Sequence, residues 1–528
     1  MNSSKRFIYL PLVFALLLVL GIYIGYRYSF TNNSNATGNN DKIAKLLSYI
    51  QKRYVDTVNQ TQLEDKALNT LLQNLDPHSS YVTAKEAQAM NEPLQGNFGG
   101  IGIEFNIIKD TIRVVSAISG GPSEALGILA GDMIVKIEGK GAAGVRITNQ
   151  QVIGKLRGES GTKVNISVKR RGVKKLIDFS IIRGEIPIYS IDAAYMVGTK
   201  TGYIKVSRFG ATTYDEYMKA FKELRKKGLS SLILDLRGNP GGYLNAAVML
   251  ADEFLEAGKE IVHTQGRSER KKVHTATIKG EFEKNKLIIL IDEGSASASE
   301  IVAGAVQDND RGTIIGRRSF GKGLVQEEKE FDDGSAVRLT IARYYTPTGR
   351  CIQKSYGGGV EAYYSEEIDR YNTGELQNAD SVKFNDSLKY KTPSGKIVYG
   401  GGGIMPDVFV PLDTAGRTIY LSEVTYSGLL NQFAFDYADR NRSQLKGYEN
   451  FERFNKTFIV SDKLLEEFVL FAEKSKVKRR ENEIQKSAAI IKTQLKALIA
   501  RNTWSSAGYY PVIHTIDNAF RKAVELAQ

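Results

Sequence analysis

Residues 286–326 join an apolar run, a series of small residues and a helix-like segment, a succession that predicts a strand, a turn and a helix. Lys286–Ile291 is typical of a buried strand, and Glu300–Val306 has helical character. In the small residues between them, 294–299, serine alternates with alanine. A serine on such a turn is held rigidly beside backbone N–H groups that favour negative charge. Acyl-transfer chemistry needs this position for a nucleophile and its oxyanion.

The same residues also permit a purely structural interpretation. Ser297-x-x-Glu300 ahead of an apolar run is a capping box, in which Ser297 only satisfies backbone donors. A basic partner favours chemistry instead: Lys322 follows a second apolar run, Thr313–Gly316, and lies between two glycines, Gly321-Lys322-Gly323. The local pattern alone leaves both interpretations open.

The segments GSASASEIVAGAVQD (294–308) and GRRSFGKGLVQ (316–326) resemble the active-site segment of the carboxyl-terminal processing peptidases, also called tail-specific proteases. That family uses a Ser–Lys dyad. The resemblance implies that Ser297 is the nucleophile, Lys322 the base, and Gln326 the residue that orients the lysine.

From about residue 185 strands and helices alternate, which predicts an α/β core. Within it, LSSLILDLRGNPGGYLNAAVMLADEFL (229–255) indicates a strand, a glycine turn and a helix, and the turn resembles the family's DLRxNxGG motif. The resemblance implies that Gly241 or Gly242, with the N–H of Ala298, forms the oxyanion hole. A tight turn that needs positive φ is the structural alternative, and both can hold at once.

Residues 96–184 resemble a PDZ domain, with Gly99–Phe105 as the carboxylate-binding loop and the strand after it. Glycines let backbone N–H groups converge on a terminal carboxylate, while the peptide adds a strand at the sheet edge. A glycine-bulged hairpin and a nucleotide loop are the alternatives. Arg157 either pairs with a bound carboxylate, braces the domain against the protease, or is a solvated helix end. The predicted peptide-binding residues are Gly100, Ile101, Gly102, Ile103 and Arg157.

Composition excludes several other chemistries. The single cysteine, Cys351, rules out an intrachain disulfide and any CxxC metal site, and the four histidines form neither an HExxH motif nor a triad motif. Gly316–Lys322 is nearly a phosphate-binding P-loop, but Gly323 stands where magnesium coordination needs Ser or Thr. Despite a net charge of +13, the basic residues are scattered apart from 474–480, which we interpret as a solvated helix face. We expect no metal, no cofactor and no nucleic-acid partner.

The N-terminal segment predicts a membrane anchor. Lys5 and Arg6 precede Phe7–Tyr26, which contains no charge and spans about one bilayer's hydrocarbon thickness as a helix. No small-x-small cleavage site precedes Arg27, which favours an uncleaved anchor over a removed signal peptide. The positive flank should remain cytoplasmic. We therefore expect a protein of the bacterial cell envelope, anchored in the inner membrane with its catalytic part in the periplasm or extracytoplasmic space.

The overall prediction is a multidomain α/β protein. A polar, tyrosine-rich insertion at about 355–398 is expected to be a surface excursion, and His78 in LDPHSSYVT to be structural. The helical tail can pack on the core, mediate assembly such as a homo-oligomer, or bind an adaptor or other partner. The expected parts are an anchor (1–30), a flexible linker (31–40), a helical region (41–95), the PDZ domain (96–184), the protease core (185–410) and a helical C-terminal domain (411–528).

The predicted function is a membrane-anchored endopeptidase that recognises free C-termini of protein or peptide substrates. Its resemblance to the processing peptidases covers about residues 40–410. A non-catalytic PDZ adaptor that keeps the protease fold is one alternative, and it would predict loss of Ser297, Lys322 or Gln326, all of which are present. A hydrolase of small esters would not need the PDZ-like segment. A structural envelope protein would need neither the dyad nor the glycine turn.

Overall fold

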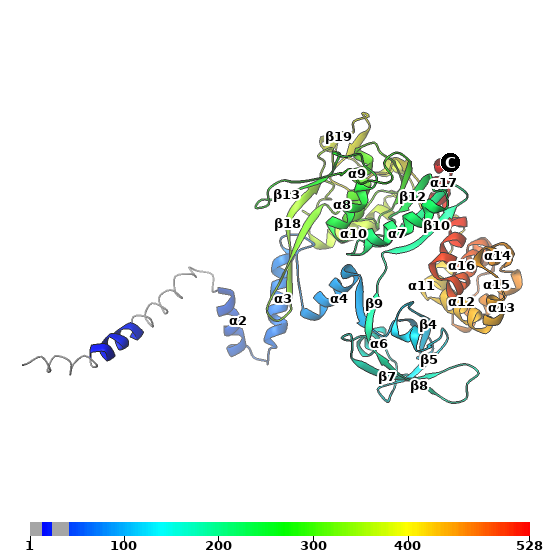
Figure 1. Cartoon of the computed structure of the whole chain (residues 1–528), viewed down its shortest axis with the longest axis horizontal. Coiled ribbons are helices and arrows are strands. Elements are labelled where there is room, and N and C mark those ends of the chain that lie inside the picture. The colour runs from blue at the N-terminus through cyan, green and yellow to red at the C-terminus, as the bar shows by residue number, and fades with distance from the viewer. Residues whose placement is uncertain (1–12, 24–41) are drawn as a thin grey trace, which may run out of the picture. The chain divides into compact units, whose positions relative to one another are not determined.

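The computed structural model describes residues 13–23 and 42–528, and the chain divides into two compact units, Met1–Leu75 and Asp76–Gln528. In the first unit, residues 13–23 are helical, and two further helices follow, α2 (Lys42–Arg53) and α3 (Gln60–Gln73) (Figure 1). Asn59 caps α3 by accepting a hydrogen bond from the Gln62 N–H. The helices predicted for this region are confirmed.

The predicted anchor is only partly covered by the structure. Of Phe7–Tyr26, residues 13–23 are described; the remaining positions and the predicted linker at 31–40 lie outside the described residues. Among the helices of the described ranges, none has both the length and the apolar character needed to cross a membrane.

In the second unit, a six-stranded sheet forms the predicted PDZ region. Its strand order places β3 (Ile103–Ile107) at an edge, beside β4 (Ile112–Ala117). Helix α6 (Asn149–Leu156) begins at a capping box formed by Thr148 and buries Val152 and Leu156. The other strands of this sheet are β5 (Met133–Ile137), β6 (Lys140–Gly141), β7 (Lys163–Lys169) and β8 (Ile177–Ile182), and a short helix, α5 (Pro122–Ala125), follows β4.

Two short strands join this region to the rest of the unit. β2 (Asn97–Gly100) pairs antiparallel with β9 (Gly184–Pro187), so the chain enters and leaves the PDZ region at one place. Ahead of β2, helix α4 (Ala84–Gln95) begins at a capping box formed by Thr83. The carbonyl of Leu94 at the end of α4 accepts a hydrogen bond from the Ala211 N–H of the protease core.

A second six-stranded sheet forms the centre of the protease core. An antiparallel edge strand, β10 (Ile191–Val197), is followed by parallel strands in the order β11, β12, β15, β16 and β21. Every residue of β11 and β12 is buried, as expected for strands covered on both faces. The parallel strands are β11 (Thr201–Val206), β12 (Ser231–Asp235), β15 (Lys286–Ile291), β16 (Thr313–Gly316) and β21 (Val408–Phe409).

Alternate side chains of these strands enter two different cores. Leu232 and Leu234 pack with the helices α7 (Thr213–Lys226), α8 (Leu244–Asp252) and α9 (Ala298–Asp308). Ile233, between them, packs with the C-terminal helix α17 (Asn518–Ala527), which Figure 1 shows in red beside the strands. The period of two along a strand therefore assigns one face of the sheet to three helices and the other to α17.

A second sheet of the core carries the lysine predicted as the base. β17 (Leu324–Glu330) and β18 (Ala336–Tyr345) form a hairpin around Asp333-Gly334, and Lys322 lies just ahead of β17. The pairing shifts register between Val325 and Gln326, at a bulge. The sheet is completed by β1 (Ser80–Val82), β13 (Glu260–Gln265) and β14 (Lys272–Thr275).

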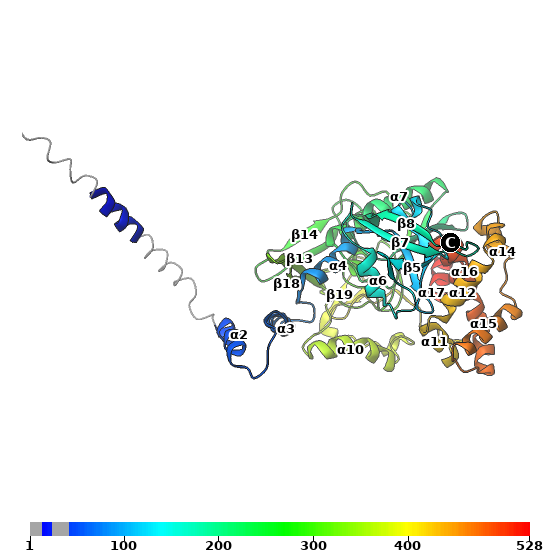
Figure 2. The ribbon, with the colours of Figure 1, turned by 90° about the horizontal axis from the view of Figure 1, so that it is seen from below.

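The tyrosine-rich insertion contains regular structure. Its main element is α10 (Gly359–Asn372), seen at the lower edge of the protease core in Figure 2, which buries Tyr363 and Arg370. Part of this segment is therefore packed into the fold instead of being a simple surface excursion. The shorter elements are two 3-10 turns, Ala379–Ser381 and Asp386–Leu388, and the hairpin of β19 (Lys389–Lys391) and β20 (Ile397–Tyr399).

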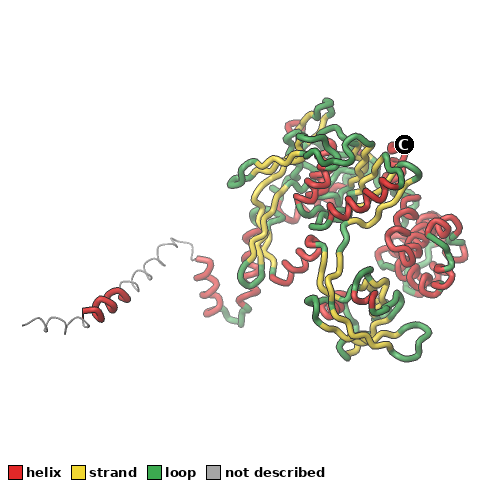
Figure 3. Tube along the Cα trace, in the orientation of Figure 1, coloured by secondary structure: helices red, strands yellow, loops and turns green. Residues whose placement is uncertain are grey.

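The C-terminal region is helical, as predicted (Figure 3). The long helix α16 (Glu481–Ile513) is interrupted at Trp504 and Ser505. The basic stretch 474–480 is not a helix face, because α15 ends at Lys474 and Arg479 and Arg480 instead form ion pairs with Glu466 and Glu423. The remaining helices are α11 (Ile419–Tyr426), α12 (Leu429–Arg440), α13 (Arg442–Lys446), α14 (Phe451–Thr457), α15 (Asp462–Lys474) and the 3-10 turn His514–Ile516.

The last helix belongs to the protease core. Phe520 stacks on His514 at 3.9 Å between ring centroids and meets Tyr203 of β11 edge to face at 5.5 Å. Asp517, the N-cap of α17, forms an ion pair with Arg237 at 2.8 Å. Of the roles left open for the helical tail, packing on the core is the one that α17 performs.

We expect Phe520→Ala to lower the free energy of unfolding by about 3–5 kcal/mol, because it removes a buried aromatic ring and leaves a cavity on the sheet. Urea unfolding followed by tryptophan fluorescence and circular dichroism measures the change. Glu525→Ala on the exposed side of α17 is the matched control and should cost at most about 0.5 kcal/mol. Equal stability of the two variants would contradict the packing role of α17.

Candidate active site

Ser297 occupies a strained position between β15 and α9. Its φ of 54° and ψ of −113° lie where residues other than glycine are uncommon. Strain of this kind is found at functional sites, where the surrounding structure holds it. All eleven residues of α9 are buried, so the serine lies at the N-terminus of a helix that is fixed on every side. That end of a helix carries partial positive charge.

The glycine turn after β12 lies directly against this serine. A Cβ at Gly241 would come within 2.7 Å of the Ser297 Cβ and 2.9 Å of the Ala298 nitrogen, so only glycine fits there. The Gly241 N–H donates to Asn239 Oδ1 at 2.9 Å. In contrast, the N–H groups of Gly242 and Ala298 donate no hydrogen bond within the described part of the chain. Two unused donors therefore flank the serine.

Lys322 and Gln326 are joined by a direct contact. Lys322 Nζ donates to Gln326 Oε1 at 3.1 Å, and Gln326 Nε2 donates to the carbonyl of His78 at 2.5 Å. Burial lowers the pKa of Lys322, and the charge of Arg338 lowers it further. Within residues 42–528 no hydrogen bond joins Lys322 Nζ to Ser297 Oγ.

The serine and the lysine open into the same cleft, which has a volume of about 1290 Å³. One side is formed by α4 and by the loop from Ser207 to Ala211, and the other by β17. Gly241 and Gly242 also line the cleft, together with Gln326. The structure thus places five of the residues that we predicted from sequence around one space large enough for an extended peptide.

Two further residues at this site contact the backbone of both Ser297 and Lys322. The capping pattern predicts a contact of Glu300 with Ser297 only. In the structure, the Glu300 carboxylate accepts hydrogen bonds from the N–H groups of Ser297 (2.8 Å), Gly321 (2.7 Å) and Lys322 (2.9 Å). Burial raises its pKa to about 7 despite these donors. The Tyr344 hydroxyl lies within hydrogen-bonding distance of the carbonyls of Ser297 and Lys322. No local motif marks Tyr344.

The predicted carboxylate-binding loop lies between β2 and β3. The carbonyls of Ile101 and Gly102 accept hydrogen bonds from Ser123 and Ile118, while the N–H groups of Ile101 and Gly102 donate none within the described residues. Gly102 has a φ of +73°, and a Cβ there would meet Ile186 at 2.9 Å. Gly100 ends β2 and Ile103 begins the edge strand β3.

Arg157 contacts helix α4 in this structure. It caps the C-terminus of α6, forms an ion pair with Glu92 of α4, and lies over the ring of Phe98 at 4.0 Å. Of the three roles considered for Arg157, this contact corresponds to bracing, because α4 is hydrogen-bonded to the protease core through Leu94.

Cys351 is not among the residues that line this cleft. Burial raises the pKa of the half-buried Cys351, which disfavours the reactive thiolate. Across residues 13–23 and 42–528, no group of three or more His, Cys, Asp and Glu side chains is arranged to hold a metal ion.

Three family models match the chain. Residues 200–363 match peptidase family S41, residues 99–181 match the PDZ domain, and residues 420–505 match a family of unknown function, DUF8443. The first two correspond to the protease core and to the sheet of β3–β8. The third covers most of the C-terminal helices.

Curated relatives agree with these matches. The chain is 38% identical over 347 residues to a carboxy-terminal-processing protease of Bartonella bacilliformis, covering 63% of this chain and 79% of the relative. It is 33% identical over 383 residues to the carboxy-terminal processing protease CtpA of Bacillus subtilis, and the match covers 71% of this chain and 80% of the relative. A solved photosystem II D1 C-terminal processing protease is 25% identical, with a TM-score of 0.36, covering 69% of this chain and 85% of that one. The chain therefore belongs to the carboxy-terminal processing proteases of peptidase family S41.

Proposed function

We propose that this protease hydrolyses peptide bonds through an acyl-enzyme formed on Ser297, with Lys322 as the base. One observation carries the proposal: the strained Ser297 and the half-buried Lys322 line the same cleft, where the lysine amine donates a hydrogen bond to a neutral amide. The missing hydrogen bond between them is compatible with this assignment, because catalytic hydrogen bonds are often long until substrate binds.

The proposed steps use groups already described. Ser297 Oγ attacks the scissile carbonyl while Lys322 Nζ takes the hydroxyl proton, and the lysine then returns that proton to the leaving amine. The N–H groups of Gly242 and Ala298 stabilise the oxyanion, each contributing roughly 3–4 kcal/mol in the transition state. Lys322 then deprotonates a water molecule that attacks the acyl carbonyl, the bond from that carbonyl to Ser297 Oγ breaks, and the lysine returns the proton to Oγ.

The surroundings of Lys322 suit a base better than an acid. An ordinary lysine is protonated at neutral pH, so burial must favour the neutral amine. A carboxylate partner would oppose this by stabilising the ammonium form. Gln326 accepts a hydrogen bond without carrying charge, so it orients the amine and leaves its proton affinity low.

The PDZ region is proposed to select substrates by their C-termini. The unused N–H groups of Ile101 and Gly102 suit a terminal carboxylate, and the edge of β3 is open to an added strand. A peptide binds in this way only when its tail is extended. Unfolded or unstructured C-terminal tails are therefore the proposed substrates.

The proposal also places the enzyme at a membrane. Its support is the charge-free segment Phe7–Tyr26 behind Lys5 and Arg6, which predicts an anchor with the catalytic part on the extracytoplasmic side.

The first test compares wild type, Ser297→Ala and Lys322→Ala in the cleavage of an unfolded reporter with an apolar C-terminus. Both variants should lose at least about 10³-fold in kcat/KM, because each removes a group that acts in the same step. Lys329→Ala, an exposed lysine on β17, is the matched control and should retain activity. Undiminished cleavage by folded Ser297→Ala would leave the serine as a helix cap only.

The second test is the pH dependence of kcat/KM. Activity should rise with pH as Lys322 loses its proton, with a midpoint below the ordinary lysine value of 10.5, because burial lowers its pKa. Gln326→Glu places a carboxylate beside the amine and should move the midpoint up by about 1–3 pH units. Identical profiles for wild type and Gln326→Glu would argue against Lys322 as the base.

A further inference from the structure

We propose that Tyr363, in the insertion between the core strands, is a positioning residue for the lysine base and acts on it through His78 and Gln326. This inference rests on the proposed function, since it concerns how Lys322 is held in its working orientation. Tyr363 is 2% exposed and belongs to α10, so the insertion reaches into the core at this point.

The first link is the orientation of the Gln326 amide. An amide has an accepting oxygen and a donating nitrogen, and only the oxygen suits a lysine base that must be held without charge. The carbonyl of His78 accepts from Gln326 Nε2 at 2.5 Å, which turns Oε1 toward Lys322 Nζ. Were the amide reversed, nitrogen would face nitrogen and oxygen would face the carbonyl. The position of His78 therefore decides which end of Gln326 meets the lysine.

The second link is the contact between Tyr363 and the His78 ring. The Tyr363 hydroxyl lies 2.8 Å from His78 Nε2, and the rings meet edge to face with centroids 5.1 Å apart. Gln353 Nε2 donates to the same hydroxyl at 3.3 Å, so the phenol proton is available to His78. Burial and the charge of Lys322 lower the pKa of His78 to about 4, which leaves a neutral ring that accepts this proton.

A third link connects Tyr363 to the lysine loop itself. Gln353 Oε1 accepts a hydrogen bond from the N–H of Gly323, the residue after Lys322, at 2.8 Å. Gln353 thus contacts both the loop that carries the base and the hydroxyl of Tyr363. The carbonyl of Pro77, the residue before His78, accepts a hydrogen bond from the Tyr364 hydroxyl at 3.0 Å. Helix α10 therefore contacts this segment through two tyrosines.

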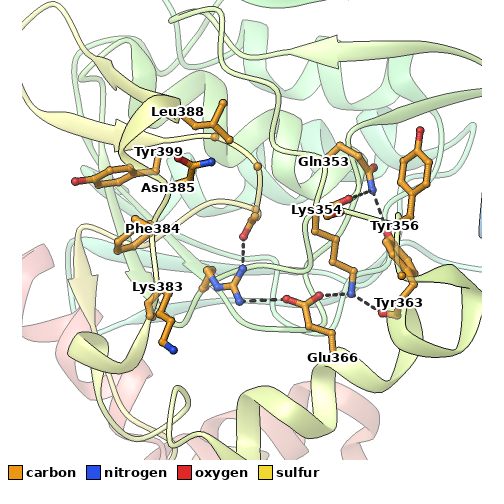
Figure 4. A pocket seen from close by; sticks show the side chains of 18 of the residues that line it. Gln353, Lys354, Tyr356, Tyr363, Glu366, Lys383, Phe384, Asn385, Leu388 and Tyr399 are labelled. Atoms are coloured by element: carbon orange, nitrogen blue, oxygen red, sulfur yellow. Dashed lines mark hydrogen bonds and ion pairs between the residues drawn. The ribbon is translucent and has the colours of Figure 1, made fainter.

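The helix that carries Tyr363 is itself fixed by a buried cation. Figure 4 shows Lys354 between Tyr363 and Glu366: its Nζ donates to the Tyr363 carbonyl at 2.9 Å and pairs with the Glu366 carboxylate at 2.5 Å. The same Nζ lies 4.2 Å from the centroids of the Phe320 and Tyr363 rings. These contacts hold α10 against the lysine loop and form one wall of a cavity of about 520 Å³.

The experiment is Tyr363→Phe, which keeps the ring and removes only the hydroxyl. We expect kcat to fall roughly tenfold, the effect of losing one buried hydrogen bond, with KM changed by less than about twofold. Tyr371→Phe, on the exposed side of the same helix, is the matched control and should leave both constants unchanged. Wild-type kcat in Tyr363→Phe would overturn the inference.

A double-mutant cycle separates positioning from general destabilisation. If Tyr363 acts through Gln326, adding Tyr363→Phe to Gln326→Ala should cost no further activity, whereas a structural effect would multiply the two losses. His78→Phe, which keeps the backbone carbonyl and removes the ring nitrogen, should reproduce the loss of Tyr363→Phe and add nothing to it. Multiplicative losses in either pair would overturn the proposal.

The parent variants distinguish this inference from the proposed function. Lys322→Ala is measured in the same assay. If Lys322→Ala retained activity, the proposed Ser297–Lys322 dyad would be wrong, and the role proposed for Tyr363 would be wrong with it. If Lys322→Ala were inactive while Tyr363→Phe behaved as wild type, only the role of Tyr363 would be wrong.

Discussion

A single buried carboxylate, that of Glu300, accepts hydrogen bonds from the backbone of both proposed catalytic residues, Ser297 and Lys322. It also accepts from Ser319 Oγ at 2.5 Å and from the Gly321 N–H. The nucleophile and the base come from different segments, and this one side chain sets their backbone separation. A carboxylate can do so because its two oxygens together offer about four acceptor sites. Burial makes each contact strong and makes any unfilled site costly.

A comparable arrangement holds the glycine turn on the other side of the serine. Arg237, the first residue of the turn, pairs with Asp235 at 2.6 Å and with Asp517 at 2.8 Å. Burial opposes ionisation of Asp235, but the charges of Arg237 and Lys205 hold its pKa below the usual range. The turn that lies against Ser297 is thus held by a neighbouring residue of β12 and by a residue of the C-terminal helical region. The proposed oxyanion donors and the proposed base are each supported by residues from other segments of the chain.

The sequence was most informative where a signal is local. The apolar runs at Lys286–Ile291 and Thr313–Gly316 coincide with β15 and β16, because the tendency to form a buried strand depends on neighbouring residues. The segments around Ser297 and Lys322 were sufficient to show the resemblance to the carboxyl-terminal processing peptidases. By contrast, no local pattern connects Tyr363 to His78 or Asp517 to Arg237. Such contacts depend on packing between distant segments.

Helix α17 covers one face of the central sheet, but it is the last helix of the chain to be synthesised. The last strand of that sheet ends at Phe409, whereas the helix that shields Tyr203, Ile233 and Ile288 begins at Asn518. While the intervening residues are being made, one apolar face of the sheet has no partner. A core with an open apolar face is incomplete and prone to aggregation. The apolar side chains on that face therefore remain exposed until residues 518–527 have been made.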